Sequence, residues 1–398
     1  MFLIGRDTRI SGSMLESALA AGICSVGGNV VIAGVIPTPA VAYLVRQQGF
    51  DAGAVISASH NPYPDNGIKF FDSNGYKLPD EVEDELEKYV RQSADNELAR
   101  PTGDGIGKIE FNSNLAHLYA HFVRHTIDTS LEGLTIVYDG ANGAASSVGP
   151  EILSGLGAKV ININVNPDGL NINHHCGSTH IEGLQVAVQQ HNADLGIAND
   201  GDADRCLLVD EKGQVLDGDQ IMLLCALKLK EEGKLKGDTI VGTVMSNIGF
   251  HKAAEELGMK TVSTAVGDRY VLEYMREHNL SVGGEQSGHV IFLDHNTTGD
   301  GMLTAVQVAA LMKEKKQPLS ELAGIMTKYP QVLVNVRVAT KTGWEDNDLI
   351  KAAIVTAEGE LGDEGRVLVR ASGTEPLIRV MAEGPNQEEL QSLCQEIA

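Results

Sequence analysis

The sequence predicts an α/β protein with three α/β domains of one kind and a smaller α+β domain at its C-terminal end. Three segments, beginning near Phe2, Thr135 and Thr239, share one pattern: an apolar strand, a polar or Gly-rich loop, a helix and a second strand. This order is typical of βαβ units in a parallel sheet. Because βαβ units are common, the similarity could also arise by chance. A chain of 398 residues is long enough for about two to four domains.

Changes in composition along the chain set the expected boundaries. The four predicted domains are residues 1–108, 109–212, 213–325 and 326–398. Two polar stretches, 93–114 and 313–320, are predicted linkers because they are rich in glycine or charge. The last domain is expected to contain, in order, strand 331–338, helix 347–361, strands 366–370 and 377–383, and helix 387–397.

Composition excludes several classes of function. With 42% apolar and 21% charged residues the chain is an ordinary globular protein, and no apolar run is long enough for a membrane span. A net charge of −23 opposes nucleic-acid binding. The start does not resemble a signal peptide, and five cysteines without C-x-x-C spacing suit a reducing cytoplasm. Because the net charge is strongly negative, a phosphate ligand would need local cations and backbone N–H groups.

A first polar loop follows the apolar segment 51–56 and has the sequence SASHNP. Serine, asparagine and proline are frequent in turns, so the loop could be only a turn or a helix cap. The alternative is that the end of a strand presents a serine as a nucleophile. These residues alone leave both interpretations open.

The strongest single motif is NDGDADR, which lies between two predicted strands. Asp200, Asp202 and Asp204 alternate with small residues, and alternate side chains of extended backbone face the same side. Three such carboxylates repel each other unless a cation lies among them, and oxygen ligands suit Mg²⁺ or Ca²⁺. An EF-hand does not fit, because Arg205 stands where that loop needs glycine. A solvated acidic turn remains the alternative.

The motif RASGTEPLIR combines hydroxyl groups, a glycine and two flanking arginines in a tight loop between predicted strands. Hydroxyl, backbone N–H and guanidinium groups together can bind a phosphate. The candidate residues are Arg370, Ser372, Gly373, Thr374 and Arg379. An ordinary hairpin turn with exposed arginines is the alternative.

The segment GGEQSGH places a carboxylate, a hydroxyl and an imidazole between two predicted strands, at Glu285, Ser287 and His289. Such a set can form hydrogen bonds with the hydroxyls of a sugar. A Gly-rich hairpin with an exposed glutamate is the alternative. The segment VGDRY precedes a predicted helix, so Asp268 is a candidate helix cap and Arg269 could bind an anion.

Taken in order, SASHNP, DGDADR, GEQSGH and RASGTEP resemble the motifs of the α-D-phosphohexomutase family over essentially the whole chain. The resemblance implies three α/β domains with mixed sheets and a smaller α+β domain around a central cleft. GRDTRISG, PTPAVAYL, DGDQIM, GDRYVLE and Gln286 are most similar to members that act on glucosamine phosphates. The implied enzyme interconverts glucosamine 6-phosphate and glucosamine 1-phosphate, and so feeds the synthesis of UDP-N-acetylglucosamine and cell-wall precursors.

The resemblance also implies roles for individual residues. Ser59 is expected to be phosphorylated and to hold one Mg²⁺ together with Asp200, Asp202 and Asp204. The residues expected beside the transferring group are His60, Lys69 and Arg205. The residues expected at the sugar are Glu285, Ser287, His289, Asp268 and Arg269. The residues expected at the phosphate that does not react are Arg370, Ser372, Gly373, Thr374 and Arg379. Glucosamine 1,6-bisphosphate is the implied intermediate and activator, sugar phosphates are the implied partners, and a homodimer is compatible with the resemblance.

The start of the sequence departs from the family pattern. Family members carry a segment with FGTDGIRG ahead of GRDTR, whereas this sequence begins at Met1, four residues before the first glycine of GRDTR. That segment supplies an active-site arginine and a strand, and the resemblance assigns neither role to a residue here. A truncated inactive form that binds sugar phosphates is therefore one alternative. The others are a phosphoglucomutase or phosphomannomutase, because sugar choice depends on the loop 283–289, and a Mg²⁺-dependent phosphatase that passes the phosphoserine group to water.

Overall fold

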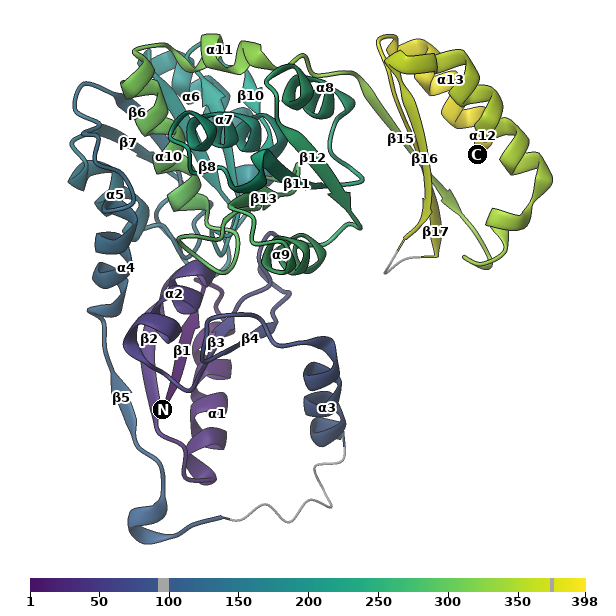
Figure 1. The fold of residues 1–398 in the computed structure, drawn as a ribbon. Coiled ribbons are helices and arrows are strands. Elements are labelled where there is room, and N and C mark those ends of the chain that lie inside the picture. The colour runs from purple at the N-terminus through teal and green to yellow at the C-terminus, as the bar shows by residue number, and fades with distance from the viewer. Residues whose placement is uncertain (92–99, 373–375) are drawn as a thin grey trace. The chain divides into compact units, whose positions relative to one another are not determined.

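In the computed structural model the described residues form four β-sheets with helices packed against them (Figure 1). The described residues are 1–91, 100–372 and 376–398. They divide into two compact units. The first unit consists of Met1–Val244 and Val262–Gly324, and the second consists of Met245–Thr261 and Ile325–Ala398.

The first sheet has the strand order β4-β3-β1-β2-β5, and all neighbours are parallel except β3 and β4. Its elements, with the helix that follows them, are β1 (Phe2–Arg6), α1 (Gly12–Ser25), β2 (Val30–Val35), α2 (Thr38–Gln48), β3 (Ala52–Ile56), β4 (Ile68–Asp72), α3 (Asp80–Arg91) and β5 (Ile109–Phe111). The consecutive residues Leu3 and Ile4 are both fully buried, so both faces of the sheet are covered. Ala20 of α1 packs with Ile4 on one face. On the other face α2 packs closely against β3. The two approach so closely that a Cβ at Gly53 would lie only 2.4 Å from the Val45 side chain.

The second sheet has the order β10-β9-β8-β6-β7, with β9 and β10 antiparallel to their neighbours. Its elements are α4 (Leu115–Arg124), β6 (Thr135–Asp139), α5 (Val148–Gly155), β7 (Lys159–Ile163), α6 (Glu182–His191), β8 (Leu195–Asn199), β9 (Cys206–Asp210) and β10 (Val215–Leu216). Leu184 and Val188 of α6 pack against Val137 on one face. Gly149 allows α5 to approach the ring of Tyr138, since a Cβ there would lie 2.4 Å from it. The strands are therefore apolar on both sides, as in other α/β proteins.

The third sheet has the order β12-β11-β13-β14, with β14 antiparallel to β13. The elements of this part of the chain are α7 (Gly218–Glu231), β11 (Thr239–Thr243), α8 (Ile248–Glu256), β12 (Lys260–Thr264), α9 (Asp268–Glu277), β13 (Val282–Gly284), β14 (Val290–Phe292), α10 (Gly301–Lys315) and α11 (Leu319–Leu322). Val271 and Met275 of α9 pack with Val241 and Ile291 of the sheet. Every residue of α10 from Gly301 to Met312 is buried, because the helix packs among α4, α5, α7, β8 and β9.

The three sheets share one strand order: β4-β3-β1-β2 in the first, β9-β8-β6-β7 in the second and β14-β13-β11-β12 in the third. In each sheet a parallel strand (β3, β8 or β13) is followed by a strand that pairs with it antiparallel (β4, β9 or β14). The prediction of three α/β domains of one kind with mixed sheets is confirmed. The loops SASHNP, DGDADR and GEQSGH therefore occupy the same topological position, between these two strands.

Two segments predicted as linkers contain regular structure. Within 93–114, residues 109–111 form β5, which pairs with β2, while 93–99 lie outside the described residues. The segment 313–320 is the end of α10 and the beginning of α11. The linker prediction was wrong for 313–320 and, within 93–114, for 109–111, because charge and glycine mark the surface, and surface residues can still belong to a helix or an edge strand.

The C-terminal part of the second unit is an antiparallel sheet of order β15-β17-β16 with two helices (Figure 1). Its elements are β15 (Gln331–Arg337), α12 (Asp348–Leu361), β16 (Arg366–Ala371), β17 (Leu377–Glu383) and α13 (Gln387–Ile397). Each predicted strand and helix here is confirmed to within one residue at either end. The predicted smaller α+β domain is confirmed as well.

A buried carboxylate connects α8 to this sheet within the second unit. Glu383 is fully buried and accepts four hydrogen bonds. Its Oε1 accepts from Asn247 and Gln331, and its Oε2 accepts from the backbone N–H of Ile248 and from Arg366 Nε at 2.7 Å. The guanidinium and the helix N-terminus offset the desolvation of the carboxylate.

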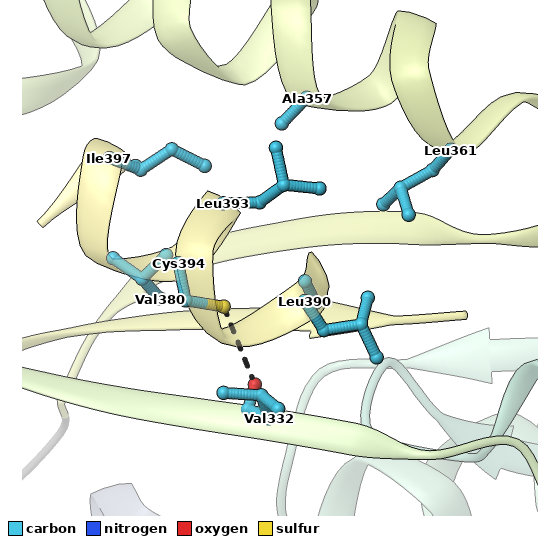
Figure 2. Close-up of a cluster of buried hydrophobic side chains, with 9 residues drawn as sticks. Val332, Ala357, Leu361, Val380, Leu390, Leu393, Cys394 and Ile397 are labelled. Carbon is cyan, nitrogen blue, oxygen red and sulfur yellow. Dashed lines mark hydrogen bonds between the residues drawn. The ribbon is translucent and has the colours of Figure 1, made fainter. Parts of the chain in front are cut away.

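The core of the C-terminal domain lies between the sheet and its two helices (Figure 2). Leu390 and Leu393 of α13 belong to one buried cluster with Leu361 of α12 and Val380 of β17. The Cys394 thiol donates to the Val332 carbonyl at 3.7 Å. These apolar contacts, more than the exposed helix surface, determine the stability of the domain.

Leu390→Ala is expected to destabilise this domain by about 2–5 kcal/mol, because a fully buried leucine leaves a cavity. Urea unfolding followed by the fluorescence of Trp344, the single tryptophan of the chain, would measure it. Leu349→Ala on α12 is the control, since that side chain is 82% exposed and its removal should change stability by less than about 0.5 kcal/mol. Equal effects of the two substitutions would contradict the core described above.

Candidate active site

The loop after β3 and the loop after β8 meet within the first unit. The Ser59 hydroxyl donates to Asp200 Oδ2 at 2.6 Å. Ser59 has a φ of 49°, in the left-handed region, which is strained for a residue other than glycine. Its backbone N–H donates to Ser57 Oγ at 3.0 Å. The loop therefore presents the Ser59 hydroxyl directly to the acidic motif.

The acidic loop forms a compact, buried carboxylate cluster. One oxygen from each of Asp200, Asp202 and Asp204 lies within 4.8 Å of the others. Asp202 Oδ2 accepts from the Thr38 hydroxyl at 2.6 Å and from Lys69 Nζ at 2.8 Å. In the described part of the chain, the buried Oδ1 atoms of Asp202 and Asp204 have no hydrogen-bond partner. Buried carboxylate oxygens without donors are the atoms that a hard divalent cation would bind.

The protonation of the cluster follows from burial and from the charges of its members on one another. Burial and the charges of Asp204 and Asp202 raise the pKa of Asp200 well above its ordinary value. Burial opposes ionisation of Asp202, but Lys69 outweighs it and lowers the pKa of that carboxyl. Burial likewise opposes the charge of Lys69, and the two carboxylates outweigh it and raise its pKa. Lys69 is therefore an ammonium ion that lies among the three carboxyl groups.

His60 and Arg205 lie next to the same cluster. Burial of the imidazole and the charge of Arg205 lower the pKa of His60, so the ring is neutral near pH 7. The Arg205 backbone N–H donates to Asp200 Oδ1 at 3.3 Å, and its Nε lies 4.0 Å from Asp204 Oδ1. The structure thus brings together all the residues predicted for the metal and the transferring group.

The sugar motif and the segment before α9 also lie side by side. Glu285 Oε1 accepts from the Gly267 N–H at 3.1 Å, and His289 Nε2 lies 3.7 Å from Asp268 Oδ2. Asp268 is not the predicted helix cap: Gly267 occupies the N-cap position, and the Asp268 carboxylate binds Lys77 instead. Burial opposes its charge, but Lys77 and His289 outweigh burial and lower the pKa of Asp268. The cap prediction was wrong because the partner is distant in the sequence.

Ser287 and Arg269 are the other two residues predicted at the sugar. Ser287 is exposed at the tip of its loop. Arg269 Nε lies 3.8 Å from Oε1 of Glu273, which is on the same helix. Beside Asp268 and Arg269 a cavity of about 330 Å³ opens, with Lys77 and Thr298 also in its wall. This volume is in the range of sites for small ligands.

The predicted phosphate loop belongs to the second unit and connects β16 to β17. Arg370 and Arg379 stand directly opposite each other on these strands. Burial and the charge of Arg379 lower the pKa of Arg370. Like charges placed opposite each other in a sheet are unfavourable, so a bound anion would relieve this pair. Ser372 is buried at the start of the loop, while Gly373 and Thr374 lie outside the described residues.

The sequence interpretation missed several residues that contact these loops: Arg9, Thr38, Lys77, Asn173 and Lys341. Arg9 and Thr38 are part of the motifs GRDTRISG and PTPAVAYL, which signal the family but no individual contact. Lys341 Nζ donates to the Ser372 carbonyl at 2.8 Å. No local pattern marks these residues, because each contact joins segments that are far apart in the sequence.

Family models account for nearly the whole chain. The models of phosphoglucomutase/phosphomannomutase α/β/α domains I, II and III match residues 1–97, 115–213 and 217–329, and the model of the C-terminal domain matches residues 333–398. The chain belongs to the phosphoglucomutase/phosphomannomutase family, the α-D-phosphohexomutases that its motifs resemble. That prediction is confirmed, and the chain is an enzyme of the intramolecular phosphotransferase class.

Curated relatives match over the full length of the chain. A phosphoglucosamine mutase of Desulforamulus reducens is 56% identical over 396 residues, which cover 100% of this chain and 89% of the relative. A phosphoglucosamine mutase of Symbiobacterium thermophilum is 57% identical over 398 residues, which cover 100% of this chain and 88% of the relative. Both relatives are named phosphoglucosamine mutase. This agrees with the sequence motifs, which are most similar to members that act on glucosamine phosphates.

Solved structures of more distant family members share the fold. A phosphoglucomutase/phosphomannomutase family protein from Burkholderia thailandensis has a TM-score of 0.81 at 24% identity, covering 99% of this chain and 87% of that chain. Aspergillus fumigatus N-acetylphosphoglucosamine mutase, solved with GlcNAc-6P and magnesium, has a TM-score of 0.70 at 20% identity, covering 96% of this chain and 92% of that chain.

Among the described residues, no helix combines the length and apolar character required to cross a bilayer.

Proposed function

We propose that this enzyme interconverts glucosamine 6-phosphate and glucosamine 1-phosphate through a phosphoserine at Ser59 and a glucosamine 1,6-bisphosphate intermediate. The observation that carries the proposal is the 2.6 Å hydrogen bond from the Ser59 hydroxyl to Asp200, within the buried acidic cluster. A nucleophile at a cation site suits phosphoryl transfer, which depends on positioning and on neutralising charge. The two curated phosphoglucosamine mutases support the choice of sugar.

The residues of the cluster fit Mg²⁺. Asp200, Asp202 and Asp204 supply only oxygen donors, and two of their buried oxygens have no partner within the described residues. Together with Ser59 they would hold the ion, which would withdraw charge from the oxygens of the transferring phosphoryl group. Lys69 Nζ lies 2.8 Å from Asp202 Oδ2 and 3.5 Å from Asp204 Oδ2, so it leaves the Oδ1 atoms of both carboxyl groups for the cation.

The chain's own groups can carry the proton and the charge. When the phosphoryl group leaves Ser59 Oγ for a sugar hydroxyl, that hydroxyl loses a proton and Ser59 Oγ gains one. The neutral imidazole of His60 is the proposed acceptor of the sugar proton, because Lys69 is already protonated. The Lys69 ammonium and Arg205 then stabilise negative charge on the transferring oxygens. The bisphosphate reverses and returns its other phosphate to Ser59.

Two further groups are proposed to hold the substrate. The proposed sugar residues are Glu285, Ser287, His289, Asp268 and Arg269, and the proposed phosphate residues are Arg370, Ser372, Gly373, Thr374 and Arg379. Contacts among Gly267, Glu285 and His289 support the first group, and the opposed arginines of β16 and β17 support the second. We also propose a cytoplasmic location, which five buried free cysteines support, and a homodimer, which sedimentation would test.

Mass spectrometry of freshly purified protein is expected to find a fractional addition of about 80 Da, one phosphoryl group, on Ser59. Ser57 should stay unmodified, because its hydroxyl is buried and donates to Asp7. A coupled assay with glucosamine, glucose and mannose phosphates would then measure which sugar phosphate the enzyme converts. A phosphate on another residue, with Ser59 always bare, would contradict the proposed nucleophile.

A further inference from the structure

Arg9 is a buried arginine that contacts the loop of Ser59. Its side chain is 0% exposed, and all five guanidinium N–H groups donate hydrogen bonds. Nε binds Asp7 Oδ2 at 2.9 Å. The other four donors all bind carbonyls of the loop between β3 and β4: Ser59, Asn61, Pro62 and Asp65. The guanidinium therefore binds the loop at four points along its length.

Asp7 extends this contact to the backbone of Ser59. Its carboxylate accepts from the Ser57 hydroxyl at 2.5 Å, and Ser57 Oγ accepts from the Ser59 N–H at 3.0 Å. A buried ion pair pays for much of its attraction in desolvation, and a well-packed apolar pair is often at least as stable. Stability alone is therefore a weak reason for an arginine and an aspartate at these positions.

The contacts also determine which way the peptide after Ser59 points. The Ser59 carbonyl accepts from Arg9 Nη2 at 2.8 Å and from Asn173 Nδ2 at 2.9 Å. The chain has no cis peptide bond among its described residues, so the His60 N–H, in the same peptide, points away from Arg9. Within the described residues this N–H has no hydrogen-bond partner. It is available to a phosphoryl group on Ser59.

We infer that Arg9 is a positioning residue that shapes the phosphoserine loop: it fixes the left-handed backbone of Ser59 and directs the His60 N–H toward the transferring phosphoryl group. Asn173, from the connection between β7 and α6, assists by donating to the carbonyls of Ser59 and Asn61. This inference rests on the proposed role of Ser59. It assigns to Arg9 an effect on the rate of transfer and little effect on substrate binding.

Arg9→Lys tests the inference, because lysine keeps the charge but has three donors on one atom instead of five on a planar group. We expect kcat per folded molecule to fall about ten- to thirtyfold with KM changed less than about threefold, since a small misplacement of reacting groups lowers the rate. Hydrogen exchange of residues 57–67 should accelerate about tenfold, with the exchange of β6 and β8 unchanged. Thermal melting gives the folded fraction.

Arg46→Lys is the matched control, since Arg46 also donates to a backbone carbonyl, that of His295 at 2.8 Å, away from this loop. It should change neither kcat nor exchange in residues 57–67. If Arg9→Lys accelerates exchange throughout the chain, Asn173→Gly decides: it removes two donors to the loop and tolerates the φ of 58° at that position. It should accelerate exchange only in residues 57–67.

The inference would be overturned if hydrogen exchange in residues 57–67 were unchanged in the variant that decides the test, which is Arg9→Lys or, where that variant loosens the whole chain, Asn173→Gly. A parental kcat per folded molecule despite faster exchange in the loop would overturn it as well. If the parental chain itself transfers no phosphate, the proposed function fails, and the exchange measurement still decides whether Arg9 shapes the loop. The two failures are thereby distinguished.

Discussion

Asp202→Asn is expected to lower kcat for glucosamine phosphate interconversion by about 10²- to 10³-fold, the cost of removing one member of a preorganised electrostatic site. Asp202 is fully buried, and its Oδ2 accepts from both Thr38 and Lys69. An amide removes the charge that Lys69 pairs with and weakens an oxygen donor to the cation. Steady-state kinetics with saturating Mg²⁺ would measure the loss.

A second measurement separates metal binding from catalysis. Mg²⁺ should raise the melting temperature of the parental enzyme, because an ion that binds only the folded state stabilises it. The rise should be smaller or absent in Asp202→Asn. Asp210→Asn is the control: Asp210 is 3% exposed at the end of β9, and its Oδ1 accepts from the N–H groups of Lys212 and Gln214. Parental turnover and a parental Mg²⁺ response in Asp202→Asn would show that the acidic cluster is not the metal site.

The loops of the active site could be predicted because each one interrupts a strongly apolar strand with several polar residues. Asp200, Asp202 and Asp204 illustrate this: their alternation in extended backbone already places them on one side, and the structure brings their oxygens within 4.8 Å. What the residues could not indicate is that the three loops occupy one position in three similar sheets. Strand order is set by pairing between distant segments, for which no single stretch carries a signal.

The residues that support the loops could not be predicted for the same reason. Arg9 follows a strand end, and its partners in the loop lie 50 to 56 residues away. Asp268 stands where a helix cap is common, but Lys77, 191 residues away, provides a cationic partner. β5 has only three residues, and its pairing with β2 leaves no periodic pattern. In each case tertiary contacts override a local preference.

Arg379→Ala is expected to raise KM about 10²-fold for both glucosamine 6-phosphate and glucosamine 1-phosphate, by similar factors in the two directions. Removing one charge-assisted, bidentate contact to a phosphate costs about 1.5–3 kcal/mol, which corresponds to about one to two decades in affinity. The factors should match because, in the proposed reaction, the same loop holds the phosphate that does not react whichever end of the sugar it belongs to. The variant should also release more bisphosphate into solution during turnover.

The pairing of β16 with β17 gives the physical reason for this expectation. Arg370 and Arg379 stand opposite each other, an arrangement of like charges that a bound phosphate would stabilise. Inorganic phosphate should therefore raise the melting temperature of the parental chain more than that of Arg379→Ala. Arg337→Ala is the control, because that exposed arginine lies on β15 opposite Leu377, and it should leave KM within about twofold of the parental value. A defect of Arg379→Ala confined to one direction would mean that the loop binds only one of the two phosphates and that the bisphosphate reverses by some other route.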